Sequence, residues 1–252
     1  MRPNLLRKFK AEGRPIVNAW LSIGSSYAAE AIAHQGFDAV TVDCQHGMIG
    51  FEAAITMLQA ISTTPAIPMV RPSGLMPSEI MRFLDAGAYG IICPMISTAQ
   101  DAADLVAACR YPPGGNRSFG PARGMLYGGA DYLDKANEEI VVLAMIETRE
   151  GLDNLESILA VKGLDGIYVG PNDLSLALGH RPENESSVAE VIEAIERIRE
   201  RTVAMGKIAG IFCSNGPAAA LRVRQGFDLV TPGNDAALLR GVMRDAVDAS
   251  RA

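Results

Sequence analysis

Charged side chains stand directly after several apolar segments of the sequence. Glu147 ends the run IVVLAMI, Asp43 and His46 follow DAVTV, Arg71 ends IPMV, and Asp173 comes soon after GIYVG. A lone buried carboxylate is costly unless it protonates, pairs or binds a metal. Two carboxylates suit a hard cation, a histidine near an acid accepts a proton near neutral pH, and an arginine stabilises an oxyanion. Together these residue types predict metal-assisted proton abstraction beside a carbonyl, or cleavage of a carbon–carbon bond.

The elements that must position these residues are short apolar runs that alternate with amphipathic segments. We expect strands at 16–21, 38–43, 67–71, 89–93, 140–146, 166–170, 207–212 and 228–231. We expect helices at 25–35, 51–63, 76–86, 98–110, 150–160, 187–205, 215–225 and 234–249. Eight continuously apolar strands, each followed by a helix, predict a parallel (β/α)8 TIM barrel, with residues 1–252 as a single domain. A doubly wound sheet is the alternative, but no G-x-G-x-x-G motif follows the first strand.

In a barrel of this kind, the functional groups lie just beyond the carboxyl ends of the strands. The residues singled out above, together with Asn172, Phe212, Ser214 and Asn215, should therefore meet at one rim. Each also has an ordinary alternative: Asp173 as a helix N-cap, Arg71 as a surface residue, Glu147 paired with Arg149, and His46 as a loop histidine. The long interruption at 111–139, rich in Gly and Pro at first, could be a lid or an oligomer contact.

Composition narrows the class of protein. The net charge of −6 and the lack of a Lys/Arg run argue against a nucleic-acid or anionic-membrane partner. The first residues contain no apolar signal region, and the longest apolar run, of about seven residues, is too short for a membrane span. Four cysteines without C-x-x-C spacing are typical of a reducing cytoplasm rather than of a disulfide framework or zinc site. We expect a cytoplasmic location.

Several motifs along nearly the whole chain point to one family. They are VDCQHG (42–47), VRP (70–72), DAGAYGIICPM (85–95), RYPPGGNRSFG (110–120), IETREGLDNL (146–155) and GLDGIYVGPNDLSLALG (163–179). By these motifs the chain resembles the metal-dependent, class II pyruvate aldolases of the HpcH/HpaI type, in the phosphoenolpyruvate/pyruvate barrel superfamily. The resemblance implies reversible cleavage of 4-hydroxy-2-keto acids to pyruvate, or hydroxypyruvate, and an aldehyde through a metal-bound enolate.

The resemblance also implies residue roles. Glu147 and Asp173 would bind a divalent metal (Mg²⁺, Mn²⁺ or Co²⁺), and His46 would be the base or direct a water that is. Arg71 would polarise the ketone oxygen, and Asp43 would orient the histidine. The residues that would contact substrate are Arg71, Gly170, Pro171, Asn172, Asp173 and Phe212, with the amides of 172 and 173 receiving the keto acid carboxylate and Phe212 lining the aldehyde pocket.

Asp85 precedes the fourth strand, at the opposite rim, so it cannot reach the site of its own chain. In the relatives an acid here reaches a histidine of a neighbouring subunit. The resemblance therefore implies a homo-hexamer, a dimer of trimers, in which the last helix is exchanged between subunits.

Two positions depart from many relatives: Gln45 replaces Glu before the histidine, and Met145 replaces Gln two residues before the metal-binding Glu. The loop at 119–128 also looks shorter than in relatives that hold a terminal acid of the aldehyde, and Arg123 is a weak candidate for that role. We therefore expect a small or hydroxylated aldehyde.

Other activities remain open from the sequence. A related branch would act on 2-keto-3-deoxy sugar acids or acyl-CoA esters. A Schiff-base aldolase would need a lysine at a strand end, whereas Lys207 begins its strand. A non-enzymatic 2-keto acid sensor would need no base, and the pair of His46 and Arg71 argues against it.

Overall fold

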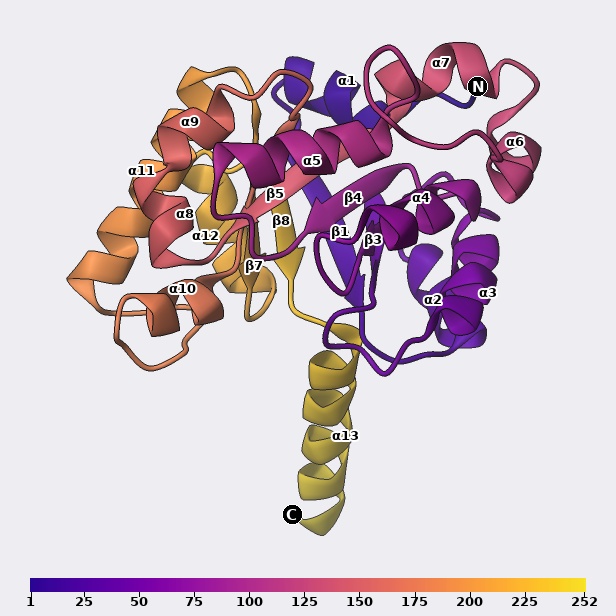
Figure 1. Ribbon diagram of the computed structural model, residues 1–252. Coiled ribbons are helices and arrows are strands. Elements are labelled where there is room, and N and C mark those ends of the chain that lie inside the picture. Colours follow the sequence, from indigo (N-terminus) through magenta and orange to yellow (C-terminus); the bar gives the residue numbers. More distant parts are fainter.

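A closed barrel of eight parallel strands forms the centre of the protein in a computed structural model, which describes residues 1–252 (Figure 1). Its strands are β1 (Ile16–Leu21), β2 (Ala39–Asp43), β3 (Ile67–Arg71), β4 (Gly90–Cys93), β5 (Val141–Ile146), β6 (Gly166–Val169), β7 (Ile208–Cys213) and β8 (Leu229–Pro232). Neighbours in sequence are neighbours in the barrel, and β8 closes against β1 through the pairs Ile16–Leu229 and Val17–Val230. The expected strands and the TIM-barrel fold are confirmed.

The strands read as continuous apolar runs because both of their faces are covered. Every residue of β2, β3 and β5 is buried, with side chains alternating between the barrel interior and the surrounding helices. A polar chain crosses the interior: the Tyr168 hydroxyl donates to Thr231 Oγ1 at 2.7 Å, which accepts from Asn18 Nδ2 at 3.0 Å. Thr41 Oγ1 donates to Asn18 Oδ1 at 2.9 Å. These buried polar groups are therefore satisfied within the barrel.

Thirteen helices surround the barrel or extend from it. They are α1 (Leu5–Ala11), α2 (Ser26–Ala33), α3 (Phe51–Ile61), α4 (Pro77–Asp85), α5 (Ala99–Cys109), α6 (Ala122–Gly128), α7 (Tyr132–Glu139), α8 (Arg149–Asp153), α9 (Leu155–Leu159), α10 (Pro171–Ala177), α11 (Ala189–Ala204), α12 (Gly216–Arg224) and α13 (Asp235–Arg251). The sequence did not reveal α1, nor α6 and α7 within 111–139. The helix expected at 150–160 is two helices, because the chain turns at Asn154, whose side-chain amide donates to the Ser97 carbonyl at 2.9 Å.

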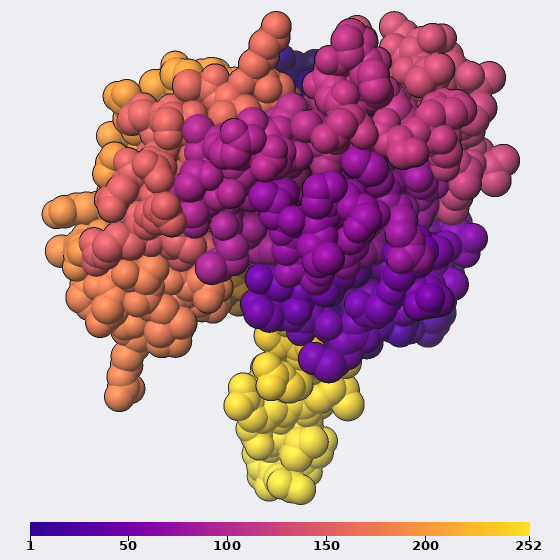
Figure 2. All heavy atoms as spheres, in the orientation of Figure 1, coloured from indigo at the N-terminus to yellow at the C-terminus, as the bar shows by residue number.

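Helix α13 does not pack along the barrel but projects away from it (Figures 1 and 2). Of its residues only Asp235 is buried. The outer surface that the last helix would cover is instead a groove of about 350 Å³, with an apolar lining from β1, α2 and the beginning of α13. None of the helices is both long and apolar enough to cross a lipid bilayer.

Candidate active site

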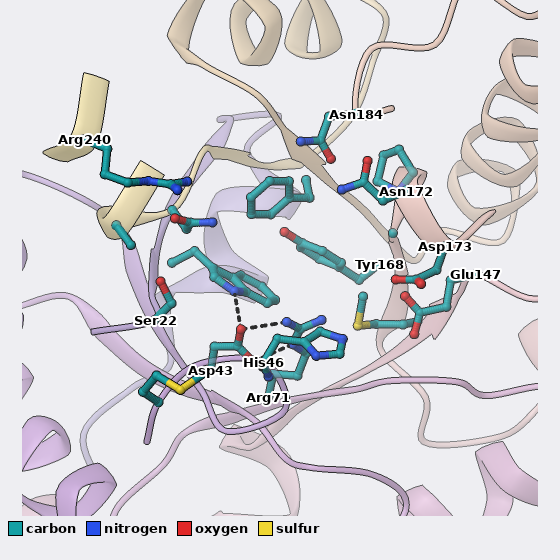
Figure 3. A pocket seen from close by; sticks show the side chains of 18 residues that line it. Ser22, Asp43, His46, Arg71, Glu147, Tyr168, Asn172, Asp173, Asn184 and Arg240 are labelled. Carbon is teal, nitrogen blue, oxygen red and sulfur yellow. Dashed lines mark hydrogen bonds and ion pairs between the residues drawn. The ribbon is translucent and has the colours of Figure 1, made fainter. Parts of the chain in front are cut away.

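One pocket of about 520 Å³ opens at the carboxyl ends of the strands, where a TIM barrel carries its functional groups (Figure 3). The structure brings together in it nine of the eleven residues that the sequence analysis expected at this rim: Asp43, His46, Arg71, Glu147, Gly170, Pro171, Asn172, Asp173 and Phe212. The other two lie outside the lining: the Ser214 N–H donates to Glu185 at 3.1 Å, and Asn215 is the N-cap of α12. Parallel strands end at the same edge, so residues far apart in sequence share this rim.

Glu147 immediately follows β5, and only 2% of the residue is exposed. Its Oε1 accepts a hydrogen bond from the Met95 main-chain N–H at 2.8 Å. Met95 has a φ of 59°, the left-handed region that costs a side-chain-bearing residue free energy, and this turn places its N–H at the carboxylate. The second oxygen, Oε2, is buried without any hydrogen-bond partner in the chain. One oxygen of Glu147 is therefore held in place while the other lacks a partner.

Burial raises the pKa of Glu147 to about 7, against the lowering effect of the Met95 hydrogen bond and with a further rise from the nearby Asp173 charge. Asp173 is the third residue of α10, which begins at Pro171 with Gly170 as its N-cap, so the interpretation of Asp173 as the N-cap is wrong. Figure 3 shows the Asp173 and Glu147 carboxylates beside each other at one side of the pocket.

Gly170 leaves room for this carboxylate pair. A Cβ atom at position 170 would lie 2.3 Å from Glu147 Oε2, so any larger residue would displace the unpartnered oxygen. Two adjacent carboxylates, one with an orphaned buried oxygen and a raised pKa, form a donor set that suits a hard divalent cation, whose other positions water and substrate oxygens would complete. Glu147 and Asp173 are thus the residues that fit a metal.

Arg71 and Asp43 form a buried ion pair beside this carboxylate pair. Arg71 donates from Nε and Nη2 to the two Asp43 oxygens, at 2.8 and 2.7 Å, and 7% of the arginine is exposed. Burial alone would raise the pKa of Asp43, but the Arg71 guanidinium and the hydrogen bonds from the His46 N–H and the Trp20 indole hold it below its usual value. The interpretation of Arg71 as a surface residue is wrong. Its charge is fixed at the pocket by a bidentate partner.

His46 lies on the turn after β2, and its residue is exposed at the pocket. Asp43 accepts hydrogen bonds from the main-chain N–H groups of Gln45, at 3.1 Å, and His46, at 3.2 Å. No hydrogen bond joins the Asp43 carboxylate to the imidazole. Asp43 therefore orients His46 by fixing the main chain of its turn, while both carboxylate oxygens are engaged by Arg71.

An aromatic wall of the pocket consists of Trp20, Tyr168 and Phe212. The rings of Trp20 and Tyr168 stack with centroids 5.5 Å apart, and Phe212 meets Trp20 edge-on at 5.8 Å. Phe212, near the end of β7, is only partly buried and faces the pocket. Met145, one of the departures noted in the sequence, also lines the pocket.

Sequence reasoning missed several lining residues. They are Trp20, Ser22, Met48, Tyr168, Asn184, Asn234, Ala236 and Arg240. Trp20 and Tyr168 lie inside strands that read as ordinary core, and Arg240 lies six residues beyond the N-cap of α13. The position of Trp20 and Ser22 at the end of the first strand was an available signal, which a survey of all eight strand ends would have found.

Three other residues considered in the sequence analysis lie away from the pocket, as expected for Asp85 and Lys207. Asp85 ends α4 and accepts a hydrogen bond from the buried Arg117 at 2.7 Å. Arg123, considered for an aldehyde acid, instead donates to the Ala86 carbonyl at 2.7 Å. Lys207 donates to the Leu164 carbonyl ahead of β6, and no lysine lines the pocket. A Schiff-base site is therefore not formed here, as the sequence predicted.

The alternative pairing of Glu147 with Arg149 is also wrong. Arg149 points to Glu190, 3.6 Å away, with both side chains about half exposed. The carboxylate of Glu147 thus has no cationic side chain bonded to it, and its only hydrogen-bond partner is the Met95 N–H.

The raised pKa of Glu147 makes metal affinity depend on pH. Below pH 7 the metal-free protein carries a proton that a cation must displace, whereas above pH 7 the carboxylate is already ionised. The apparent affinity for Mn²⁺ should fall about tenfold for each pH unit below 7 and level off above it. Calorimetric titration of metal-free protein between pH 5.5 and 8.5 measures this, with Glu147→Gln as the variant that should bind weakly at every pH. A flat affinity between pH 5.5 and 7 would contradict the assignment.

Comparison with known proteins places this arrangement in a family. A family model described as HpcH/HpaI aldolase/citrate lyase matches residues 17–240. The chain is 47% identical over 249 residues to the hydroxypyruvate/pyruvate aldolase of Rhizorhabdus wittichii, with 99% of each protein covered. It is 41% identical over 232 residues to the 4-hydroxy-2-oxo-heptane-1,7-dioate aldolase of Salmonella paratyphi C, which covers 90% of this chain and 87% of the relative.

A solved structure indicates the same family as the relatives found by sequence. The HpcH/HpaI aldolase/citrate lyase family protein of Burkholderia cenocepacia superposes with a TM-score of 0.92 at 33% identity, covering 99% of this chain and 100% of that one. The matches extend over the strands that carry Asp43, Arg71 and Glu147. The chain belongs to the HpcH/HpaI aldolase/citrate lyase family.

Proposed function

We propose that this protein is a divalent-metal-dependent class II aldolase that reversibly cleaves 4-hydroxy-2-keto acids to pyruvate, or hydroxypyruvate, and an aldehyde. The observation that carries the proposal is the pair of carboxylates, Glu147 and Asp173, facing the same pocket as the Arg71 guanidinium and the His46 imidazole. The names of the two curated relatives, a hydroxypyruvate/pyruvate aldolase and a 4-hydroxy-2-oxo-heptane-1,7-dioate aldolase, support the same substrate class.

The carboxylate pair would hold Mg²⁺, Mn²⁺ or Co²⁺, all of which accept oxygen ligands. Once bound, such a cation supplies Lewis-acid chemistry, which lowers the cost of negative charge on a neighbouring oxygen. Arg71 uses Nε and Nη2 to bind Asp43, so Nη1 remains for the ketone oxygen of the substrate. Its fixed positive charge then stabilises that oxygen as it becomes an enolate.

The keto acid carboxylate fits the beginning of α10. The first main-chain N–H groups of a helix have no acceptor within the helix. The N–H groups of Asn172 and Asp173 also form no hydrogen bond elsewhere in the chain. Gly170 and Pro171 bring this turn to the pocket. The carboxylate of the substrate would thus be held beside the metal pair, which fixes the direction in which the rest of the substrate points.

His46 would act as the base, directly or through a water. In the cleavage direction it takes the proton of the C4 hydroxyl, the C3–C4 bond breaks, and the aldehyde carbonyl forms. The electron pair moves into the C2–C3 bond and onto the ketone oxygen, giving an enolate that Arg71 stabilises. Protonation at C3 then yields pyruvate. The exposed imidazole can reach solvent as well as the pocket, as this proton exchange requires.

Exchange of the pyruvate C3 protons with deuterated water tests this function without any aldehyde. Exchange should stop on exhaustive chelation and return with Mg²⁺, Mn²⁺ or Co²⁺. His46→Ala should lower the exchange rate by about 10²–10⁴-fold while still binding metal. His34→Ala, at an exposed position on the barrel exterior, is the matched control and should exchange like the parent. Full exchange by chelated enzyme, or inactivation by borohydride with pyruvate, would show that the metal mechanism is wrong.

Phe212 would line the part of the pocket that receives the aldehyde. Its ring stands edge-on to Trp20 on the aromatic wall, and it is not fully buried. An aromatic face here limits the size of the aldehyde without touching the carboxylate pair.

Substitution of Phe212 distinguishes a residue that lines the aldehyde pocket from one that only packs in the hydrophobic core. Phe212→Ala and Phe212→Trp should change the ratio of kcat/KM between a long and a short aldehyde by about 10–200-fold, with C3 exchange retained. The buried Phe227, which is not a lining residue, gives the contrast. Phe227→Ala should lower the free energy of unfolding by about 3–5 kcal/mol and leave the ratio unchanged. If both Phe212 variants keep the parent ratio of kcat/KM between the long and the short aldehyde, Phe212 does not line the aldehyde pocket.

We also propose that the protein acts as a homo-hexamer with α13 exchanged between subunits. The helix exposes an apolar stripe with helical spacing: Leu238, Leu239, Val242, Met243 and Val247. The apolar groove lined by β1, α2 and the beginning of α13 lies where the last helix of a barrel would pack. The helix of a second copy would cover that groove and bury its own stripe.

Asp85 would also contact a neighbouring subunit. Its partner Arg117 is fully buried, but 26% of the Asp85 side chain remains exposed, so the carboxylate can contact a second subunit. Asp85 would then reach the histidine of a neighbouring subunit.

The four unpaired cysteines are consistent with a reducing compartment, which supports a cytoplasmic location.

A charge on the apolar stripe tests the exchange. Sedimentation of the parent should give the mass of six chains of 26.7 kDa. Val242→Glu should shift the population to smaller species, because a carboxylate would be buried in the groove. Arg244→Glu adds a carboxylate on the other face of α13 and should leave the mass unchanged. A monomeric parent would contradict the proposal.

A further inference from the structure

The pocket has a second polar side, which the proposed chemistry does not use. Ser22 and Arg240 lie there, on the other side of Tyr168 from Glu147 and Asp173 (Figure 3). The guanidinium of Arg240 points toward the interior of the pocket. Arg240 forms no ion pair or hydrogen bond within the chain.

The base of α13, which carries Arg240, is fixed to the barrel. Asp235 accepts hydrogen bonds from the Ser22 N–H at 2.7 Å, the Ser22 hydroxyl at 2.8 Å and the Ile23 N–H at 3.2 Å. Asn234 caps the helix by accepting from the Ala237 N–H at 2.8 Å. Arg240 follows five residues after Asp235, on the second turn. Its main chain is therefore placed at the pocket even though the rest of α13 projects away.

The charges of the lining residues leave Arg240 uncompensated. Arg71 already has an anionic partner, Asp43, which accepts two hydrogen bonds from it. A divalent cation between Glu147 and Asp173 would offset their two charges. Arg240 is then the one lining guanidinium without an anionic partner, at the side of the pocket remote from the metal pair.

We propose that Arg240 binds an anionic tail on the acceptor aldehyde and so determines specificity for aldehydes that end in a carboxylate or phosphate. The inference rests on the proposed aldolase function, and it adds the chemical class of the acceptor. The keto acid occupies the side with Glu147, so the aldehyde extends past Phe212 toward Arg240. A guanidinium can bind carboxylate or phosphate oxygens through two parallel hydrogen bonds, a geometry that a lysine cannot reproduce.

The sequence analysis considered Arg123 for such a contact and expected a small or hydroxylated aldehyde. The position of Arg240 favours an anionic aldehyde instead. Arg123 is bound to the ends of α3 and α4, through Ser62 and Ala86, and does not line the pocket. The cation that the site offers comes instead from α13, a helix whose direction the sequence could not give.

Paired acceptors test the role of Arg240. Aldol addition of pyruvate is measured with 4-oxobutanoate against butanal, and with glyceraldehyde 3-phosphate against glyceraldehyde, so that carboxylate and phosphate tails are distinguished. Arg240→Gln should lower kcat/KM by about 10–100-fold for the tail that Arg240 binds and by less than about twofold for its neutral counterpart. Arg240→Lys should recover part of the loss. Arg244→Gln, one turn further along α13 and outside the pocket lining, should match the parent.

Pyruvate C3 exchange and sedimentation are recorded for every variant, and both should stay at the parent values. If the parent catalyses C3 exchange and adds pyruvate to the neutral aldehydes, but Arg240→Gln leaves both anion-to-neutral ratios unchanged, the assignment of Arg240 is wrong and the aldolase function stands. If the parent neither exchanges the C3 protons nor forms an aldol, both proposals fail. A loss that is equal for anionic and neutral acceptors would also overturn the assignment.

Discussion

The buried carboxylate of Glu147 is the constraint on which the rest of the site depends. A charge enclosed at the end of a strand is unfavourable, and here one oxygen has a single hydrogen bond while the other has none. Three local features keep this arrangement in place. Met95 adopts a left-handed conformation so that its N–H reaches Oε1, Gly170 lacks the side chain that would displace Oε2, and α10 brings Asp173 beside it. A divalent cation held by Glu147 and Asp173 would relieve the repulsion between their carboxylates.

The part of the pocket around Arg71 differs from the Glu147 site because its charged groups are paired. Arg71 and Asp43 satisfy each other through two hydrogen bonds, and the remaining contacts of Asp43 fix Trp20 and the turn that carries His46. Such a pair contributes little net stability, because desolvation offsets the attraction. Its effect is positional: one carboxylate sets the direction of the guanidinium and the main chain of the histidine at once. The site therefore combines an unsatisfied acid, which calls for a ligand, with a satisfied pair that holds the groups around it.

The direction of α13 links this site to assembly. Because the helix leaves the barrel, it exposes an apolar stripe and uncovers a groove beside β1, which a second copy can fill. The same departure carries Arg240 to the pocket rim, where Asp235 fixes the base of the helix to Ser22. The proposed acceptor recognition and the proposed subunit exchange would thus both follow from one helix orientation. A change at the base of α13 would affect both.

The sequence by itself determined the strands and most of the catalytic rim. A strand covered on both faces must be apolar throughout, and parallel strands must end at one edge, so Glu147, Arg71 and His46 could be placed together from their positions alone. Only the tertiary structure decided which groups contact which. An amphipathic helix such as α13 has the same spacing of apolar residues whether it packs on its own barrel or on another. The sequence therefore did not show that Arg240 lies at the pocket. Likewise, the spacing of Asp43 and His46 suggests a contact between their side chains. Instead both oxygens of the Asp43 carboxylate accept hydrogen bonds from Arg71 on the neighbouring strand, whose planar guanidinium matches them.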